Sequence, residues 1–208
     1  MNKINYQKET DKIIKKIEEE GSAPKLMLHS CCAPCSSYTL EYLSDFFEIS
    51  VFYYNPNIYP KEEFEKRFAE QKRLIEALHA KNRISLIKGE YNPNEFFEIA
   101  KGLENAKEGF ERCFKCYRQR LEKTAFLAKE MGFDYFCTTL SISPLKNSQK
   151  INEIGFETAE RFGVKWLPSD FKKKEGYKRS IELSREYDLY RQDFCGCIYS
   201  KRAKEEEN

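Results

Sequence analysis

The residues of this chain best suited to chemistry are its eight cysteines, five of which fall into two closely spaced groups. Cys32 and Cys35 are three residues apart and directly follow Cys31, and Cys113 and Cys116 repeat the same spacing. Residues three apart on a helix share one face, so each group can direct two sulfur atoms towards one centre. Four thiolates bind either a tetrahedral zinc ion or an iron–sulfur cluster, and the pattern therefore predicts a metal centre.

The spacing favours an iron–sulfur cluster over structural zinc, with thiols that bind no metal as a third interpretation. Zinc ribbons carry their cysteine pairs about 15–20 residues apart on small turns. Here one group follows a predicted strand and the other opens a predicted helix, far away along the chain. Because such distant groups meet only in the folded protein, the sequence leaves open which four of the five cysteines are the ligands.

Cys195 and Cys197, separated by Gly196, form a different kind of motif. Two cysteines this close form a disulfide only with a strained backbone, which glycine permits. A strained disulfide is easily reduced, which suits a redox couple better than a structural crosslink. Metal binding by both thiols, or an inert buried position, remains the alternative. Cys137 lies within a predicted strand, where we expect a small buried apolar residue.

Strands and helices alternate along the chain. The predicted strands are 25–30, 48–57, 83–91, 133–143 and 164–171. The predicted helices are 36–46, 60–80, 92–107, 113–132, 147–163 and 178–192. This alternation indicates βαβ units, a parallel sheet and helices on both faces. We expect a single α/β domain over residues 1–208, with residues 1–24 as a helical extension and 170–208 as a helical segment that carries the Cys195–Cys197 pair.

In open α/β sheets, ligands bind beyond the carboxyl ends of the strands, which is where Cys31 to Cys35 follow the first strand. The formal net charge is only +2, so any contact with nucleic acid requires a local basic patch. The sequence contains no apolar run of about 18 residues that would predict a membrane span. The first residues lack the apolar stretch of a secretion signal, and we therefore expect a cytoplasmic protein with reduced thiols.

Four motifs together resemble the epoxyqueuosine reductases of the QueH type: CCAPC, RCFKCYRQRLEKTA, TLSISPLKNSQKINEIG and SDFKKKEGYKRSIELSREYDLYRQDFCGC. The resemblance runs from about residue 25 to the C-terminus. It implies a HUP-like (Rossmann-like) α/β fold and an enzyme that reduces the epoxide of epoxyqueuosine in tRNA to queuosine, the last step in making that base. It also implies a [4Fe–4S] cluster and a redox-active cysteine pair. The implied cluster ligands are Cys31, Cys32, Cys113 and Cys116, and the implied redox pair is Cys195 and Cys197.

The same motifs contain two aspartates, Asp170 and Asp193, that are candidates for metal ligation or proton delivery. Helix capping or a solvated charge is the alternative for both. His29, directly before the thiols, is a candidate proton donor or a buried imidazole bonded to the backbone. An additional iron ion is a further possibility in this interpretation. The residues available to such an ion are Cys35, Cys195, Cys197 and Asp170.

The resemblance implies two partners, the tRNA anticodon stem-loop that carries epoxyqueuosine and an external electron donor. Basic and aromatic side chains would hold the phosphates and stack on unpaired bases, although a basic run is often only a solvated face. The candidate RNA contacts are Lys172, Lys173, Lys174, Tyr177, Lys178, Arg179 and Arg118. Two other functions remain open: a structural zinc-binding module, and a cluster-containing tRNA-thiolating enzyme of the HUP group. A thiolating enzyme needs a phosphate-binding loop after the first strand. The CCAPCSS sequence at that position leaves few free N–H groups to bind a phosphate.

Overall fold

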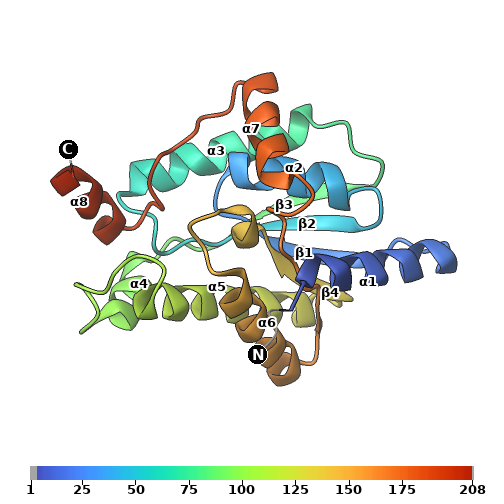
Figure 1. Ribbon diagram of the computed structural model, residues 1–208, viewed down its shortest axis with the longest axis horizontal. Coiled ribbons are helices and arrows are strands. Elements are labelled where there is room, and N and C mark those ends of the chain that lie inside the picture. The colour runs from blue at the N-terminus through green and yellow to red at the C-terminus, as the bar shows by residue number, and fades with distance from the viewer. Residues whose placement is uncertain (1–3, 208) are drawn as a thin grey trace.

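The computed structural model describes residues 4–207, which contain one five-stranded sheet with helices on both faces (Figure 1). All strands are parallel and lie in the order β3-β2-β1-β4-β5. Their bounds are β1 Lys25–His29, β2 Glu48–Tyr53, β3 Ile84–Lys88, β4 Tyr135–Thr138 and β5 Lys165–Trp166. The predicted α/β class and parallel sheet are confirmed.

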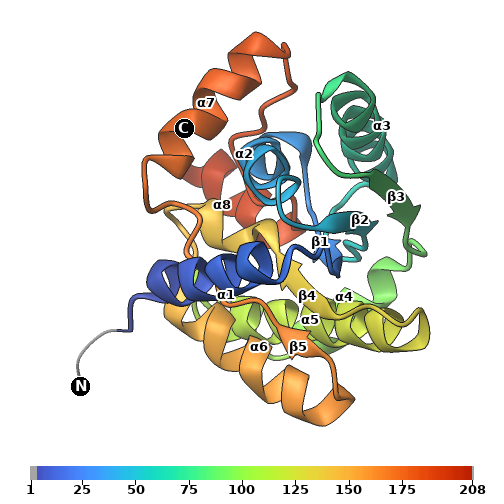
Figure 2. The same ribbon diagram turned by 90° about the vertical axis from the view of Figure 1, so that its right-hand side faces the viewer.

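The described helices are α1 Tyr6–Glu20, α2 Ala33–Leu43, α3 Lys61–Ala77, α4 Pro93–Ala100, α5 Glu111–Glu130, α6 Ser148–Phe162, α7 Gly176–Glu186 and α8 Ile198–Glu207. Figure 2 shows α2, α3 and α7 over one face of the sheet, and α4, α5 and α6 over the other. The strand β1 is therefore covered on both faces, which explains why it is almost continuously apolar. Cys137, paired with Leu28 in the sheet, is fully buried there.

The strand predicted over 133–143 ends at Thr138, and a short 3-10 helix, Thr139–Ile142, follows it. The Thr138 hydroxyl oxygen accepts a hydrogen bond from Leu140 N at 3.2 Å. This bond replaces a sheet bond and turns the chain out of the ladder, which an apolar run of residues does not reveal.

The strand predicted over 164–171 contains only Lys165–Trp166. Pro168 has no N–H to donate to a ladder, and Ser169 N donates instead to Asn152 Oδ1 at 2.9 Å. Asn152 is fully buried and also accepts from the Trp166 indole at 3.0 Å. The Asn152 side chain of α6 therefore supplies this segment with hydrogen bonds that a neighbouring strand would otherwise provide.

Two predicted helices are shorter than expected. The helix predicted over 92–107 ends at Ala100. The helix predicted over 178–192 ends at Glu186, because Asp188 adopts a left-handed conformation (φ 46°). An irregular segment then leads through the CxC motif to α8.

The two halves of the sheet are wound in opposite directions from β1. The chain leaves β1 towards β2 and β3, and it leaves β4, on the other side of β1, towards β5. The connections that follow β1 and β4 therefore diverge and leave a crevice at the carboxyl ends of these strands. The first cysteine group lies in this position.

Candidate metal centre and active-site cavity

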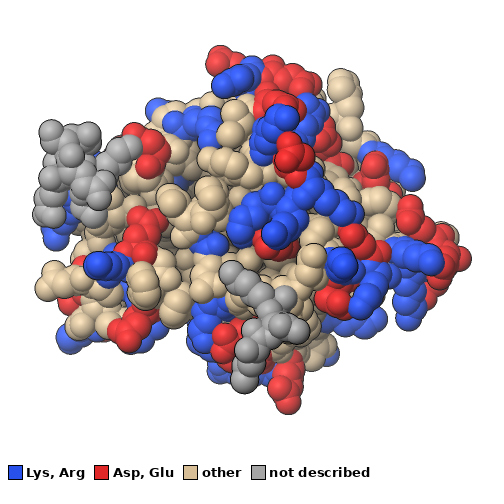
Figure 3. All heavy atoms as spheres, in the orientation of Figure 1, with Lys and Arg blue, Asp and Glu red and all other residues tan. Residues whose placement is uncertain are grey.

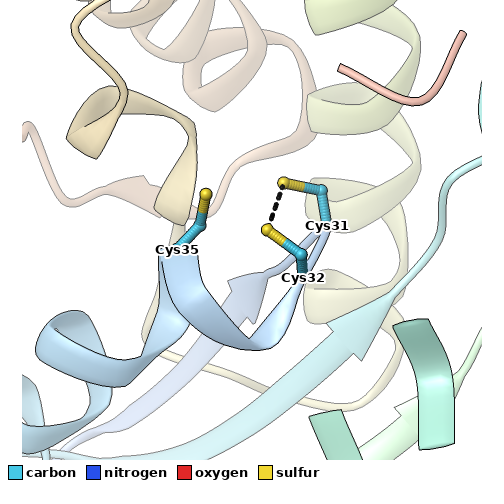
Figure 4. A group of neighbouring side chains, drawn as sticks. All are labelled: Cys31, Cys32 and Cys35. Carbon is cyan, nitrogen blue, oxygen red and sulfur yellow. Dashed lines mark hydrogen bonds between the residues drawn. The ribbon is translucent and has the colours of Figure 1, made fainter. Parts of the chain in front are cut away.

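The turn between β1 and α2 brings the sulfur atoms of Cys31, Cys32 and Cys35 within 4.8 Å of one another (Figure 4). Cys32 is the N-cap of α2 in an extended conformation, and Pro34 occupies the first turn, where its missing N–H costs nothing. The helix then returns Cys35 towards the two preceding thiols, which are 3.8 Å apart at Sγ. This group of three thiols could bind a metal ion.

Hydrogen bonds between buried side chains fix this turn. The hydroxyl groups of Ser30 and Ser36 both donate to Gln71 Oε1 of α3, each at 2.8 Å. Asn55, after β2, donates to the carbonyl oxygen of Ser30 at 2.8 Å. All four side chains are fully buried, so the sulfur positions are set by the packed core rather than by a mobile loop.

His29 joins the ends of three elements. Its Nδ1 lies 2.8 Å from Thr138 Oγ1 of β4, and its Nε2 lies 3.1 Å from the carbonyl oxygen of Tyr54. Burial lowers the pKa of His29 to about 3, so the ring is neutral at physiological pH. Nε2–H therefore donates to the carbonyl, and Nδ1 accepts from the threonine hydroxyl. This arrangement matches a buried imidazole that clamps the strands, not a proton donor.

The second cysteine group joins α5 to the segment before α8. Gly109 N donates to Cys113 Sγ at 3.1 Å, and Cys116 packs in one apolar cluster with Cys197. Burial, together with the charges of Cys195 and Cys113, raises the pKa of Cys116 to about 11 against the opposing effect of Arg120. All of these cysteines, like the others in the described structure, are free thiols.

Arg120 connects the two groups electrostatically. The residue is 1% exposed, its Nε donates to the Cys116 carbonyl oxygen at 3.2 Å, and its Nη2 has no hydrogen-bond acceptor. Burial alone would lower the pKa of Arg120, but the sulfur atoms of Cys116, Cys195 and Cys31 raise it. None of the described carboxylates forms an ion pair with it.

A buried cation without a carboxylate requires another source of negative charge. Sulfur atoms from the β1–α2 turn, from α5 and from the CxC motif are the groups that supply it here. Hydrogen bonds from Cys32 and Cys35 lower the pKa of Cys31 well below its usual value, while the pKa of its neighbour Cys32 is raised to about 12. These residues therefore fit an anionic, thiolate-held metal centre, because the thiolate is the form that binds metal.

A cavity of about 1000 Å³ opens directly onto the thiols. Its walls come from the β1–α2 turn, the 142–146 loop after β4, the start of α7 and the 191–195 segment. The lining includes Cys31, Cys32, Cys35, Cys195, Arg67, Lys146, Tyr177 and Asp193. Its volume is at the upper end of the range for small-molecule sites, so a nucleoside-sized group can enter.

The predicted aspartates lie in different environments. Asp193 is exposed and lines the cavity. Asp170 is buried and accepts a hydrogen bond from Lys172 Nζ at 2.6 Å, and it is not among the residues that line the cavity. Asp170 and the three thiols therefore do not form one group in this structure.

Most of the predicted RNA contacts surround the start of α7, where Lys and Arg side chains gather near the centre of Figure 3. Many form ion pairs: Lys172 with Asp170, Lys174 with Asp11, Lys178 with Glu175 and Arg179 with Glu41. Lys173 and Tyr177 are exposed. Arg118 lies apart from them, in a separate groove of about 720 Å³ that it shares with Lys123 and Phe126, and it is paired with Glu157.

Sequence reasoning missed Arg67 and Lys146 beside the thiols, and it named Arg120 only as a basic residue that would hold anticodon phosphates. Arg120 lies four residues after Cys116 on α5, so helical spacing alone would have placed it on the same face. Arg67 donates from Nη1 to the Cys195 carbonyl oxygen at 3.1 Å, and Lys146 follows β4. No local signal marks these two, because their neighbours come from distant parts of the chain.

Comparison with known proteins places these features in a family. A family model described as "Epoxyqueuosine reductase QueH" matches residues 26–203. The chain belongs to this family. A QueH protein of Streptococcus pyogenes serotype M1 is 46% identical over 202 residues, which cover 96% of this chain and 79% of that protein.

Other QueH relatives give the same result. The protein of Staphylococcus epidermidis is 46% identical, with 95% of this chain and 85% of the relative covered. That of Thermotoga maritima is 34% identical, with 88% of this chain and 93% of the relative covered. The predicted resemblance to the QueH family is therefore confirmed. No helix within residues 4–207 is long and apolar enough to span a membrane.

Proposed function

We propose that this protein reduces the epoxide of epoxyqueuosine in tRNA to the alkene of queuosine. The observation that carries the proposal is the cavity at the ends of β1 and β4, where three sulfur atoms within 4.8 Å of one another share the lining with Cys195. Membership of a family described as epoxyqueuosine reductases supports the same reaction.

We further propose that Cys31, Cys32, Cys113 and Cys116 hold a [4Fe–4S] cluster, with Cys35 available to an additional iron ion. When bound, such a cluster supplies single electrons at low potential. The buried Arg120 supports this assignment, because it lacks a carboxylate and is placed to neutralise the charge of an anionic sulfur-ligated group. A zinc ion on the same thiols is the second candidate, since zinc accepts the same ligands.

The CxC pair is proposed as the redox couple of the chain. Conversion of the epoxide to the alkene and water consumes two electrons and two protons. Oxidation of the Cys195 and Cys197 thiols to a disulfide releases two electrons and two protons, so this step balances. An external reductant would then restore the dithiol. Gly196, with φ 106°, gives the backbone the freedom that a disulfide between such close cysteines needs.

The proposed substrate is the anticodon stem-loop of tRNA, bound in the cytoplasm. Tyr177 is exposed and lines the cavity, where an unpaired base can stack on its ring. Lys173, Lys174 and Lys178 surround it with positive charge that suits phosphates. We propose residues 170–208 as the segment that completes the cavity of a single-domain protein, with residues 1–24 as an N-terminal extension.

The test is anaerobic reconstitution with iron and sulfide, followed by incubation with epoxyqueuosine-bearing tRNA and dithionite. Mass analysis of the nucleosides should show epoxyqueuosine replaced by queuosine, with the loss of one oxygen atom, and no change in tRNA that already carries queuosine. A colourless protein with stoichiometric zinc and no conversion would favour a structural zinc module. Sulfur incorporation into tRNA would favour a thiolating enzyme.

A further inference from the structure

Lys146 is a cation that faces the thiol cavity and has no acidic partner. It follows Ser143, Pro144 and Leu145 in the loop after β4 and lines the cavity together with Cys31, Cys35 and Cys195. Among the side chains that the structure describes, no carboxylate or carbonyl oxygen accepts a hydrogen bond from its Nζ. A charged group that borders a cavity and lacks an acceptor is available to a ligand.

The loop holds Lys146 in this orientation. Its backbone N–H donates to the Ser143 carbonyl oxygen at 3.2 Å, which closes a turn. The next residue, Asn147, caps α6 by accepting from Lys150 N at 3.1 Å. Leu145 is 72% exposed, while Lys146 is half-buried, so the turn directs the leucine outwards and the lysine inwards.

The other two cations beside the thiols, Arg67 and Arg120, already bind groups of the protein. Arg67 is 1% exposed, pairs with Glu63 at 2.6 Å and holds the Cys195 carbonyl oxygen. Arg120 is equally buried and bonds the Cys116 carbonyl oxygen. The unpartnered Nη2 atoms of both arginines are sealed from solvent. Lys146 is half-buried, and among the described residues no protein group accepts a hydrogen bond from its ammonium group.

We propose that Lys146 is a catalytic residue that donates a hydrogen bond to the epoxide oxygen of the bound nucleotide. This inference rests on the proposed function. As the carbon–oxygen bonds break, negative charge develops on this oxygen, and a fixed cation beside it stabilises that charge. The Cys195–Cys197 dithiol supplies the two electrons and two protons as it becomes a disulfide, the oxygen leaves as water, and the external reductant then restores the dithiol. Lys146 remains an ammonium before and after the reaction.

The electrostatics of the cavity keep this charge in place. Burial alone would lower the pKa of Lys146, but electrostatic attraction by neighbouring groups, led by the sulfur atoms of Cys195 and Cys31, outweighs burial and raises that pKa. A lysine on an exposed surface would interact only weakly with substrate because of solvent screening. The recessed position therefore makes Lys146 a stronger donor than the lysines around α7.

The test compares Lys146→Gln, Lys146→Arg and the control Lys81→Gln, which alters an exposed lysine that does not line the cavity. At saturating tRNA, the single-turnover rate with dithionite should fall roughly 100-fold in Lys146→Gln, as expected for loss of one fixed donor. Lys146→Arg should retain part of the rate, and Lys81→Gln should stay close to the parent protein. Iron content should be equal in the parent and all three variants.

A binding measurement without reductant provides the second readout. The parent protein should bind tRNA with epoxyqueuosine more tightly than the same tRNA with queuosine, because only the former presents the oxygen. Lys146→Gln should lose this preference, and the salt dependence of its binding should match that of the parent.

Three results would overturn the inference: an unchanged rate and preference in Lys146→Gln, lowered iron content in that variant, or equally weakened binding of both tRNAs with a flatter salt dependence. The second result would make Lys146 a counter-ion of the metal centre, and the third would make it a phosphate-binding residue. Failure of the proposed function is distinguishable, because the parent protein itself would then convert no epoxyqueuosine.

Discussion

Two regions present cysteines to the cavity, and the protein holds them in different ways. The β1–α2 turn lies between the central strand and a packed helix, and its Ser30 and Ser36 are bonded to one buried glutamine. The segment around Cys195 to Cys197 has no sheet or helix of its own. It is held by single hydrogen bonds to several elements.

Three hydrogen bonds hold the backbone of Cys195 and Gly196. Arg67 donates to the Cys195 carbonyl oxygen at 3.1 Å, and Tyr59 N donates to that of Gly196 at 2.9 Å. Cys195 N donates to Ser200 Oγ at 3.2 Å. The turn fixes where a metal centre would lie through its position between the central strand and a packed helix, whereas the Cys195–Gly196 backbone is held outside the sheet and the helices. This division suits one ligand-holding region and one region that cycles between dithiol and disulfide.

The largest expected effect is a difference in metal content between a variant of the β1–α2 turn and a variant of the CxC segment. Cys32→Ser should lose bound iron and essentially all activity, because it removes a thiolate from the fixed turn. Cys195→Ser should keep the visible absorbance of the centre and still lose about 100-fold in turnover, in line with loss of a nucleophile-type thiol. Iron analysis, absorbance and turnover measure this contrast, with Cys137→Ser as the control. A colourless Cys195→Ser protein would mean that both regions supply ligands to the metal centre.

An intermediate effect is expected from Gly196→Ala. Gly196 has φ 106°, and a Cβ there would lie 2.9 Å from Arg67 Nη1. The substitution should slow turnover roughly 10-fold through the displaced segment and change the melting temperature little, since strain of about 1–3 kcal/mol falls on a locally held loop. Turnover assays and thermal unfolding of the holoprotein test it. Substantial global destabilisation would show that the segment is part of the cooperative core.

The smallest effect is expected from the basic residues at the start of α7, which lies in the same C-terminal segment as the CxC motif. Replacing Lys173, Lys174 and Lys178 together with glutamine should weaken tRNA binding several-fold. The salt dependence of binding should fall by about one unit of slope for each phosphate that is no longer neutralised. The matched control replaces Lys12, Lys15 and Lys16, which are exposed on α1. Equal slopes in the two triple variants would place the RNA-binding surface elsewhere.

The sequence predicted the fold where local pattern and tertiary context agree. The strand β1 and the helices α3 and α6 have apolar spacing that matches their burial, and the structure places them within a few residues of the prediction. β4 and β5 are shorter than predicted because side chains of Thr138 and Asn152 replace the ladder. Such replacement depends on partners that are remote in sequence.

The site was predictable to a similar degree. Cysteine spacing indicated a metal-binding group, and the structure gathers Cys31, Cys32 and Cys35 into one. The spacing paired Cys32 with Cys35, but it left open whether Cys31 joins them, because this depends on where α2 begins. It also did not reveal Arg67 or Lys146, since a charged residue in a helix or loop usually indicates a solvated surface.

The distribution of the cavity walls along the chain has a consequence for biosynthesis. The thiol-bearing elements are the turn near residue 31, the helix near residue 113 and the segment near residue 195. On the ribosome, the first thiols emerge long before the last ones, and the site cannot close until translation is nearly finished. Nascent chains released early would therefore expose unshielded sulfur, and a metal centre held by all three elements could assemble only after synthesis.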